Sequence, residues 1–443
     1  MHVEVPQVRH TVAVQTSDIT TDSGADISAA DRLPGTPAVP GEDDALPQIT
    51  PLLVPRDGDV QPIVDPLRLA SWARNLAAGS GPVALDAERA SGFRYGSRAY
   101  LVQLRRADVG TALFDPIALG DLALLDAPLA DSEWVLHAAS QDLPCLAEAG
   151  MHPRKLFDTE LAGRLAGLPR VGLGPLVEQM LGLGLAKGHG AADWSTRPLP
   201  AAWLTYAALD VEVLIELRDA MEALLDEQGK LDWARQEFAA IVAAPPTPPR
   251  VDPWRRTSGI HKIREPRVLA IVRELWTTRD SVARRRDLAP HRVLPDTAIV
   301  AAASAKPASL DALVAMPVFA GRIQRRQAST WWDAIRRAMA LPSSALPPST
   351  LQGDGPPPPA KWALKDPKAA ARLTAARAAL AATSERINMP VENMLSPDLV
   401  RRTMWTPPAG EDIQAALRAG GAREWQIELT ADDLRGALDA PVV

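Results

Sequence analysis

Clusters of proline constrain the folding of this chain more than any other feature of its sequence. Residues 244–249 contain four prolines in six positions, and residues 342–359 end in four consecutive prolines at 356–359. Because proline fixes φ and lacks a backbone N–H, a helix or a central strand cannot run through such segments. The 443-residue chain must therefore fold as separate blocks joined by stiff linkers.

The first 46 residues form a region of a different kind. They are rich in Asp, Ser, Thr, Pro and Gly and have no sustained apolar period, so we predict a disordered acidic tail there. The predicted organisation is this tail (1–46), a first folded block (47–243), a linker (244–257), a second block (258–341), a proline-rich linker (342–359) and a third block (360–443).

The cysteine count and the apolar content indicate the cellular compartment of the protein. The chain has one cysteine, Cys145, which excludes a disulfide framework and a thiolate-only zinc site and fits a reducing environment. Its position on a predicted helix indicates a buried core residue. No stretch approaches the eighteen consecutive apolar residues that a membrane span needs. The N-terminus also lacks the basic segment followed by an apolar segment that is typical of a secretory signal. We therefore expect a soluble cytoplasmic protein with no membrane partner.

The first block combines strand and helix patterns. Apolar runs at 82–88, 99–104 and 111–115 predict three consecutive antiparallel strands. Further patterns predict a strand at 134–137 and helices near 118–129, 141–149, 159–167, 173–182 and 200–228. Strands followed by alternating strands and helices predict an α/β mixed sheet covered by helices. The second and third blocks have only helical periodicity, so each should be a small all-α bundle.

Charge is unevenly distributed along the chain. The net charge of −6 contains a tail (1–46) of net −6 and a basic region (250–340) with eighteen basic and eight acidic residues, net +10. A basic module in an acidic chain fits contact with a polyanion such as nucleic acid. An arginine-rich solvated face of a bundle is the alternative. The candidate contacts are Arg284, Arg285, Arg286, Arg322, Arg325 and Arg326.

Two carboxylates end the first predicted strand. Asp86 and Glu88 follow an apolar run, and the strand period of two places both side chains on one face. Neighbouring carboxylates repel each other unless they share a cation. Acidic residues are common in this chain, so the pair could also be incidental.

Two more acids occupy predicted helices. Asp142 falls in the first turn of a predicted helix with Ser140 as the N-cap, where an acid would also suit the helix dipole. Tyr206 and Asp210 are four residues apart and therefore share a helix face. A hydrogen bond on the helix surface would also explain this spacing. The joint occurrence of these acids and the tyrosine, in this order, is the informative feature.

This order resembles the DEDD superfamily of 3′→5′ exonucleases, in its tyrosine-bearing branch. The segments 137–143, 193–199 and 206–211 are similar to the bacterial ribonuclease D family. Residues 258–341 resemble the helical domain that RecQ-type helicases share with ribonuclease D, called HRDC, and residues 360–443 look like a degenerate second copy. The resemblance covers nearly all of the chain after the tail. It implies a ribonuclease-H-like mixed-sheet exonuclease domain followed by two small helical bundles.

The resemblance also implies roles for individual residues. Asp86, Glu88, Asp142 and Asp210 would bind two divalent cations, and Tyr206 would orient the attacking water. Carboxylate oxygens without clustered Cys or His favour Mg²⁺ or Mn²⁺ over zinc. The tyrosine should stay protonated and position the water through hydrogen bonds, because its ordinary pKa is about 10.

One residue departs from the family pattern. The position after Glu88 is commonly aromatic or aliphatic in the family, whereas here it is Arg89. This difference puts in doubt how the terminal base is packed. The loop that follows contains Arg94 and Tyr95, which could contact phosphate and stack on a base or could pack over the sheet edge. Trp194 and Arg197 are further candidates for contact with nucleic acid.

The expected function is metal-dependent 3′→5′ exoribonuclease activity. Two-metal hydrolysis of phosphodiester bonds would release nucleoside 5′-monophosphates, with 3′ ends of structured RNA such as tRNA precursors as the substrate. The motifs do not distinguish RNA from DNA, so a 3′→5′ DNA exonuclease is the alternative. A catalytically inactive nucleic-acid-binding adaptor is a third reading, against which the complete set of carboxylates argues. A monomer is the simplest expectation.

Overall fold

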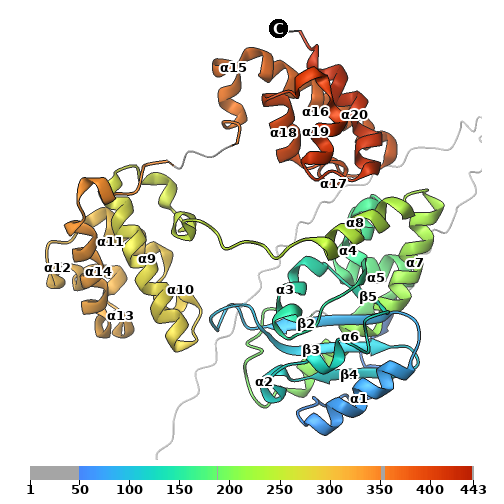
Figure 1. Ribbon diagram of the computed structural model, residues 1–443. Coiled ribbons are helices and arrows are strands. Elements are labelled where there is room, and N and C mark those ends of the chain that lie inside the picture. The colour runs from blue at the N-terminus through green and yellow to red at the C-terminus, as the bar shows by residue number, and fades with distance from the viewer. Residues whose placement is uncertain (1–48, 187, 351–354, 442–443) are drawn as a thin grey trace, which may run out of the picture. The chain divides into compact units, whose positions relative to one another are not determined.

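The computed structural model describes residues 49–186, 188–350 and 355–441 (Figure 1). The predicted acidic tail, residues 1–46, lies outside the described residues. No helix in the described part of the chain is both long and apolar enough to span a membrane.

The first block is built on a five-stranded mixed sheet with strand order β4-β3-β2-β5-β6. The strands are β2 (Val83–Arg89), β3 (Ala99–Arg106), β4 (Gly110–Phe114), β5 (Glu133–Leu136) and β6 (Lys155–Asp158). The pairs β2–β3 and β3–β4 are antiparallel, and β2–β5 and β5–β6 are parallel. The three predicted antiparallel strands and the strand at 134–137 are therefore confirmed. Strand β2 lies at the centre of the sheet and is buried along most of its length.

Helices cover this sheet. They are α1 (Pro66–Ala78), α2 (Pro116–Leu119), α3 (Leu143–Glu148), α4 (Thr159–Leu165), α5 (Leu173–Leu181), α6 (Ala201–Glu212), α7 (Leu214–Glu227) and α8 (Leu231–Ala243). Helix α6 packs across β2, β3 and β4, and α8 packs on β6. The single helix predicted over 200–228 is two helices, because the backbone departs from regular helix at Val213.

Two predictions for this block are wrong or incomplete. The helix predicted at 118–129 is only the short α2 and a 3₁₀ turn at Ala123–Leu125, because Gly120 ends α2 with a φ of 88°. Strand β6 was not predicted from the sequence, and neither was the small parallel sheet of β1 (Thr50–Leu52) and β7 (Leu183–Leu185). These strands lack the apolar run that predicted β5, because β6 has only two apolar residues in succession, β1 contains a proline and β7 a glycine.

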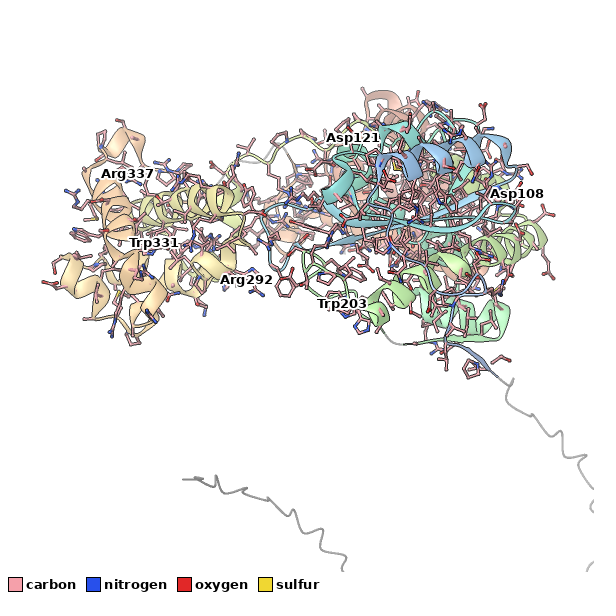
Figure 2. The ribbon with its side chains drawn as sticks, turned by 90° about the horizontal axis from the view of Figure 1, so that it is seen from below. Asp108, Asp121, Trp203, Arg292, Trp331 and Arg337 are labelled. Atoms are coloured by element: carbon pink, nitrogen blue, oxygen red, sulfur yellow. The ribbon has the colours of Figure 1, made fainter. Side chains whose placement is uncertain are left out.

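The second block is entirely helical in its described residues, as predicted. Its helices are α9 (Pro266–Arg286), α10 (Pro290–Val293), α11 (Asp296–Ala305), α12 (Leu310–Val314), α13 (Arg322–Arg326) and α14 (Ala328–Ala340). Trp331 lies in the core of this bundle and Arg337 on its outside (Figure 2). Trp254, within the predicted linker 244–257, is also buried in this core.

The third block is helical as well. It contains α15 (Trp362–Lys365), α16 (Pro367–Ile387), α17 (Val391–Met394), α18 (Pro397–Trp405), α19 (Ile413–Ala419) and α20 (Glu424–Leu438). Helix α16 packs against α18 and α20, and Trp362 and Trp425 are buried. An α/β first block followed by two all-α blocks is the predicted fold class.

Candidate active site

The side chains of the candidate site come from a central strand and the helix that crosses it. Asp86 and Glu88 lie on β2, which is hydrogen-bonded to a strand on each side. The pleat places both carboxylates on the same face, and α6 carries Tyr206 and Asp210 across the sheet. At the two carboxylates the sheet holds β2 through β3, because Asp86 pairs with Gln103 and Glu88 with Leu101, whereas the pairing with β5 ends at Ala84.

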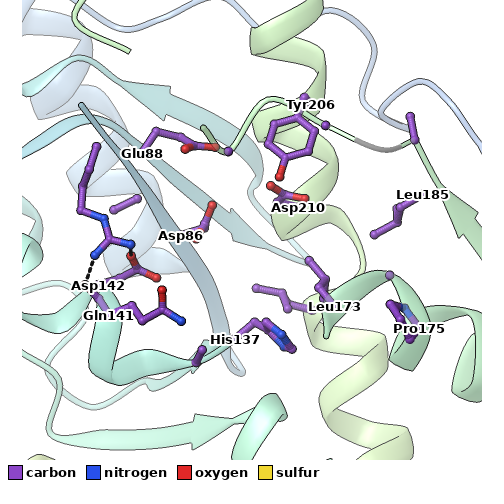
Figure 3. A pocket seen from close by; sticks show the side chains of 18 of the residues that line it. Asp86, Glu88, His137, Gln141, Asp142, Leu173, Pro175, Leu185, Tyr206 and Asp210 are labelled. Atoms are coloured by element: carbon purple, nitrogen blue, oxygen red, sulfur yellow. Dashed lines mark hydrogen bonds and ion pairs between the residues drawn. The ribbon is translucent and has the colours of Figure 1, made fainter. Parts of the chain in front are cut away.

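Three of the four predicted carboxylates converge. Asp86, Glu88 and Asp210 each offer an oxygen, and these oxygens all lie within 4.8 Å of one another (Figure 3). Asp142 lies to the side of this cluster, on the far side of Asp86 from Asp210. Its Oδ1 forms an ion pair of 3.3 Å with Nη2 of Arg89.

Asp142 differs in one detail from the prediction. It is the N-cap residue of α3 rather than a member of the first turn, and Ser140 lies in a preceding 3₁₀ turn at Ala139–Gln141. Asp142 makes no capping hydrogen bond with its side chain. Its carboxylate is therefore not used by the helix.

Burial and mutual repulsion disfavour charge on all four carboxylates. Burial, and then the neighbouring carboxylates, raise the pKa of Glu88 to about 9. Burial and then Asp86 raise the pKa of Asp142 to about 8. The pKa values of Asp86 and Asp210 are also raised, chiefly by burial. A bound cation would lower the electrostatic cost of charging this group of buried carboxylates.

The donor atoms fit hard divalent cations. Carboxylate oxygens are the ligands of Mg²⁺ and Mn²⁺, and no nitrogen or sulfur belongs to the cluster. Cys145 is buried, as predicted, and its Sγ donates to the backbone oxygen of Asp142 at 3.1 Å. Burial raises the pKa of this thiol to about 12, so it is not a thiolate ligand.

The hydroxyl of Tyr206 lies beside the carboxylate of Asp210 (Figure 3). Burial, and then the charges of Asp210 and Glu88, raise the pKa of this tyrosine, so the phenol stays protonated. Gly188 passes so close to the ring that a Cβ on this residue would come within 1.7 Å of Tyr206 Cε2. A side chain at position 188 would therefore displace the tyrosine, a constraint that the sequence alone did not reveal.

A cavity of about 660 Å³ opens onto the carboxylates. His137 and Arg170 also line it, and sequence reasoning had assigned neither to the site. Nδ1 of His137 lies 3.0 Å from Oγ1 of Thr159, and burial lowers the pKa of the imidazole to about 4. His137 therefore presents a neutral ring to the cavity at neutral pH.

The predicted nucleic-acid contacts of the first block have other partners in the structure. Nε of Arg94 donates to Oγ of Ser195 at 2.8 Å, and the hydroxyl of Tyr95 bonds to Asp280 at 3.1 Å. Trp194 is fully buried, and its ring lies 5.3 Å from that of Trp203. A buried indole cannot stack on a nucleotide without a rearrangement of this core.

Arg197, another predicted nucleic-acid contact, binds groups of the protein itself. It forms an ion pair of 2.7 Å with the buried Asp115 and donates to the backbone oxygens of Trp194 and Tyr100. Its guanidinium therefore ties the segment after Trp194 to the sheet.

The predicted arginine contacts of the second block are exposed. All six lie on the surface of the bundle, three in the last turn of α9 and three in α13: Arg284, Arg285, Arg286, Arg322, Arg325 and Arg326. Arg284 also donates to the hydroxyl of Tyr95 at 3.0 Å. The structure leaves these side chains accessible.

Family models match three parts of the chain. Residues 60–226 match the model described as 3'-5' exonuclease, and residues 268–335 match the HRDC domain. Residues 355–438 match the model described as 3' to 5' exonuclease C-terminal domain. The first two matched ranges lie within the predicted first and second blocks, and the third begins at residue 355, inside the predicted linker 342–359.

Individual proteins are similar over most of the chain. Ribonuclease D of Gluconacetobacter diazotrophicus is 32% identical over 317 residues, which cover 70% of this chain and 77% of that protein. The crystal structure of a protein from Bifidobacterium adolescentis has a TM-score of 0.83 and 38% identity, and covers 88% of this chain and 100% of that one. The Escherichia coli RNase D structure has a TM-score of 0.63 and 27% identity, with 86% and 98% covered.

Together the mixed sheet, the acidic cluster and the exonuclease match define a metal-dependent 3′→5′ exonuclease with a ribonuclease-H-like fold. The helical blocks that follow it and the similarity over most of the chain narrow the class further. The chain belongs to the ribonuclease D family, as the sequence motifs indicated.

Proposed function

We propose that this enzyme removes nucleotides from the 3′ ends of structured RNA, such as tRNA precursors, and releases nucleoside 5′-monophosphates. The observation that carries the proposal is the convergence of Asp86, Glu88 and Asp210 beside the Tyr206 hydroxyl, at the floor of the cavity. Two divalent cations, Mg²⁺ or Mn²⁺, would supply the nucleophilic hydroxide and neutralise the leaving 3′ oxygen.

The residues of this chain have separate tasks in the proposed reaction. Asp86, Glu88, Asp142 and Asp210 hold the cations. Tyr206 keeps its proton and orients the attacking water through its hydroxyl, which is why its raised pKa suits the role. The cavity provides room for the terminal nucleotide.

The preference for RNA is supported by the family. The Escherichia coli relative is described as an exoribonuclease involved in structured RNA processing. The exposed arginines of α9 and α13 add a basic surface for the phosphates of a folded RNA. One free, buried cysteine is consistent with work in the reducing cytoplasm, where we place the enzyme.

We also propose that residues 258–341 and 360–443 are two copies of one helical module. Helices α9 and α16 both have 21 residues, begin with proline and end at a residue with a φ of 48°, Asp287 and Asn388. A four-residue helix follows each of them, α10 and α17, and then a longer one, α11 and α18. This shared order supports a duplication in which the third block is the degenerate copy.

Digestion of matched oligonucleotides tests the activity. RNA and DNA strands of one sequence, each with a stem and a single-stranded 3′ end, are incubated under single-turnover conditions with Mg²⁺ and then Mn²⁺. We expect stepwise shortening of the RNA, release of nucleoside 5′-monophosphates and slower cleavage of the DNA. The Asp210→Asn variant serves as the control.

Two outcomes would contradict the proposal. Faster cleavage of DNA than of RNA would assign the site to DNA. Products that carry a 3′-phosphate, or fragments cut inside the strand, would exclude the proposed reaction.

A further inference from the structure

Arg89 directly follows the metal-binding strand and turns into the site. The register of β2 against β3 shifts between Glu88 and Arg89, so the strand is irregular at this residue. Such irregularities occur near active sites, where they redirect a side chain out of the regular alternation. In this chain the redirected side chain is a guanidinium.

The guanidinium of Arg89 holds the carboxylate that lies apart from the others. Its Nη2 is 3.3 Å from Oδ1 of Asp142, and its Nη1 donates to the backbone oxygen of Gln141. Asp142 is buried, whereas Arg89 keeps 29% of its side chain exposed and lines both the main cavity and a smaller one beside it. Arg89 can therefore leave Asp142 without crossing the core.

A divalent cation on Asp142 would meet this charge. A Mg²⁺ ion binds a carboxylate oxygen at about 2.1 Å, so on Oδ1 it would lie within about 5.4 Å of Nη2 of Arg89. Like charges at this separation repel each other, and the repulsion is stronger beside a protein surface than in bulk water. The arginine and the second cation therefore compete for the same carboxylate.

We propose that Arg89 holds the place of the second divalent cation at Asp142, and that this cation binds tightly only when Arg89 moves to a phosphate of the substrate. The inference rests on the proposed function, because it assigns the phosphate to the RNA. Arg89 is then a positioning residue that links substrate binding to completion of the metal site. The cluster of Asp86, Glu88 and Asp210 remains available to the first cation throughout.

Calorimetric titration of Mn²⁺ into the full-length protein without RNA tests the competition. We expect the wild-type protein to bind one Mn²⁺ ion tightly and a second one weakly. Arg89→Met should strengthen the second site by about tenfold or more and leave the first within about twofold. Adding Asp142→Asn to Arg89→Met should abolish the strengthened site.

A matched control separates contact from general charge. Arg170→Met removes the same charge from the same cavity. We expect it to leave the second site within about twofold of wild type. An equal effect of both substitutions, or no effect of Arg89→Met, would overturn the proposal. Should Arg89→Met fail to fold by circular dichroism, Arg89→Gln decides, because it removes the charge but keeps a polar side chain that can donate hydrogen bonds. An unchanged second site in Arg89→Gln would then overturn the proposal.

The phosphate part has its own readout. Adenosine 5′-monophosphate offers a phosphate to Arg89. In its presence, the ratio of second-site Mn²⁺ affinities between Arg89→Met and the wild type should therefore fall toward one. A difference that stays constant would exclude transfer to phosphate. Neither titration requires cleavage, so failure of the proposed function would appear only in the digestion experiment.

Discussion

The nuclease block and the second block, residues 258–341, differ in how their most informative buried charges are compensated. In the nuclease, Glu88 and Asp142 are buried among other acids, and burial, followed by the neighbouring carboxylates, raises their pKa values. In the helical block, buried charge is paired: Arg279, with 6% of its side chain exposed, bonds to Asp296 at 2.6 Å and to the backbone oxygen of Leu294. The acids that crowd together in the nuclease block thus lie in the candidate site, whereas the paired charge of Arg279 holds elements of the bundle together.

Some of the positive charge of the basic region, residues 250–340, is used within the protein. Arg267 donates to backbone oxygens at the end of α14, and Arg337 pairs with Glu274, so part of the positive charge is structural. Arg285 and Arg286 are exposed in the last turn of α9. A count of arginines thus overstates the surface that is free to meet phosphate.

The largest effect is expected in the acidic cluster. Asp210→Asn keeps the size of the side chain but removes a proposed metal ligand. Turnover should fall by at least about 10⁴-fold, because in the proposed reaction the cations would supply the nucleophile and stabilise the leaving group. Folding should persist, since one member of a repelling group is neutralised. Single-turnover cleavage and circular dichroism measure the two quantities. Near-normal cleavage would show that the cluster is not the metal site.

Tyr206→Phe should have the next largest effect. The substitution keeps the ring against Gly188 and removes only the hydroxyl, so turnover should fall by about 10²–10³-fold, as for other positioned proton-handling groups. Calorimetry should find Mn²⁺ affinity unchanged. A loss of metal affinity in this variant would give the hydroxyl a different role.

The exposed arginines should affect binding rather than chemistry. Arg285→Gln combined with Arg286→Gln should weaken RNA binding and lower the slope of log affinity against log salt by about 0.7 per lost contact. Arg336→Gln, on an exposed arginine paired with Asp333, is the matched control. Filter binding at several salt concentrations measures the slopes. Identical slopes for all three proteins would make these arginines an ordinary solvated surface.

The smallest effect concerns stability and pH. The unfolded chain releases the protons of Glu88 and Asp142 near pH 4, whereas the folded protein keeps them until about pH 9 and pH 8. The unfolded state therefore holds fewer protons in this window, and stability falls as pH rises from about 5 to 9. We expect Tm in EDTA to fall as pH rises across this range and Mn²⁺ to remove the trend. A Tm that rises with pH would contradict the assignment.

The sequence predicted the fold where local patterns were long or strongly interrupted. Three apolar runs predicted β2, β3 and β4. Helix α8 ends at Ala243, just before the first proline cluster, and α15 begins at Trp362, shortly after the second. Strands β6, β1 and β7 were not predicted, because none has the run of three apolar residues seen in β5: β6 has two, β1 contains a proline and β7 a glycine.

The sequence alone predicted which kinds of side chain form the site. The strand period places Asp86 and Glu88 on one face, and the helix period places Tyr206 and Asp210 on one face. Tertiary structure decided which of these groups meet. Packing of α6 across β2 brings Asp210 to the strand carboxylates, while the irregularity at Arg89 directs a guanidinium to Asp142. Tertiary packing also buries Trp194, which the sequence analysis had named as a candidate for contact with nucleic acid. Such contacts depend on the register and approach of distant segments, and no local pattern encodes them.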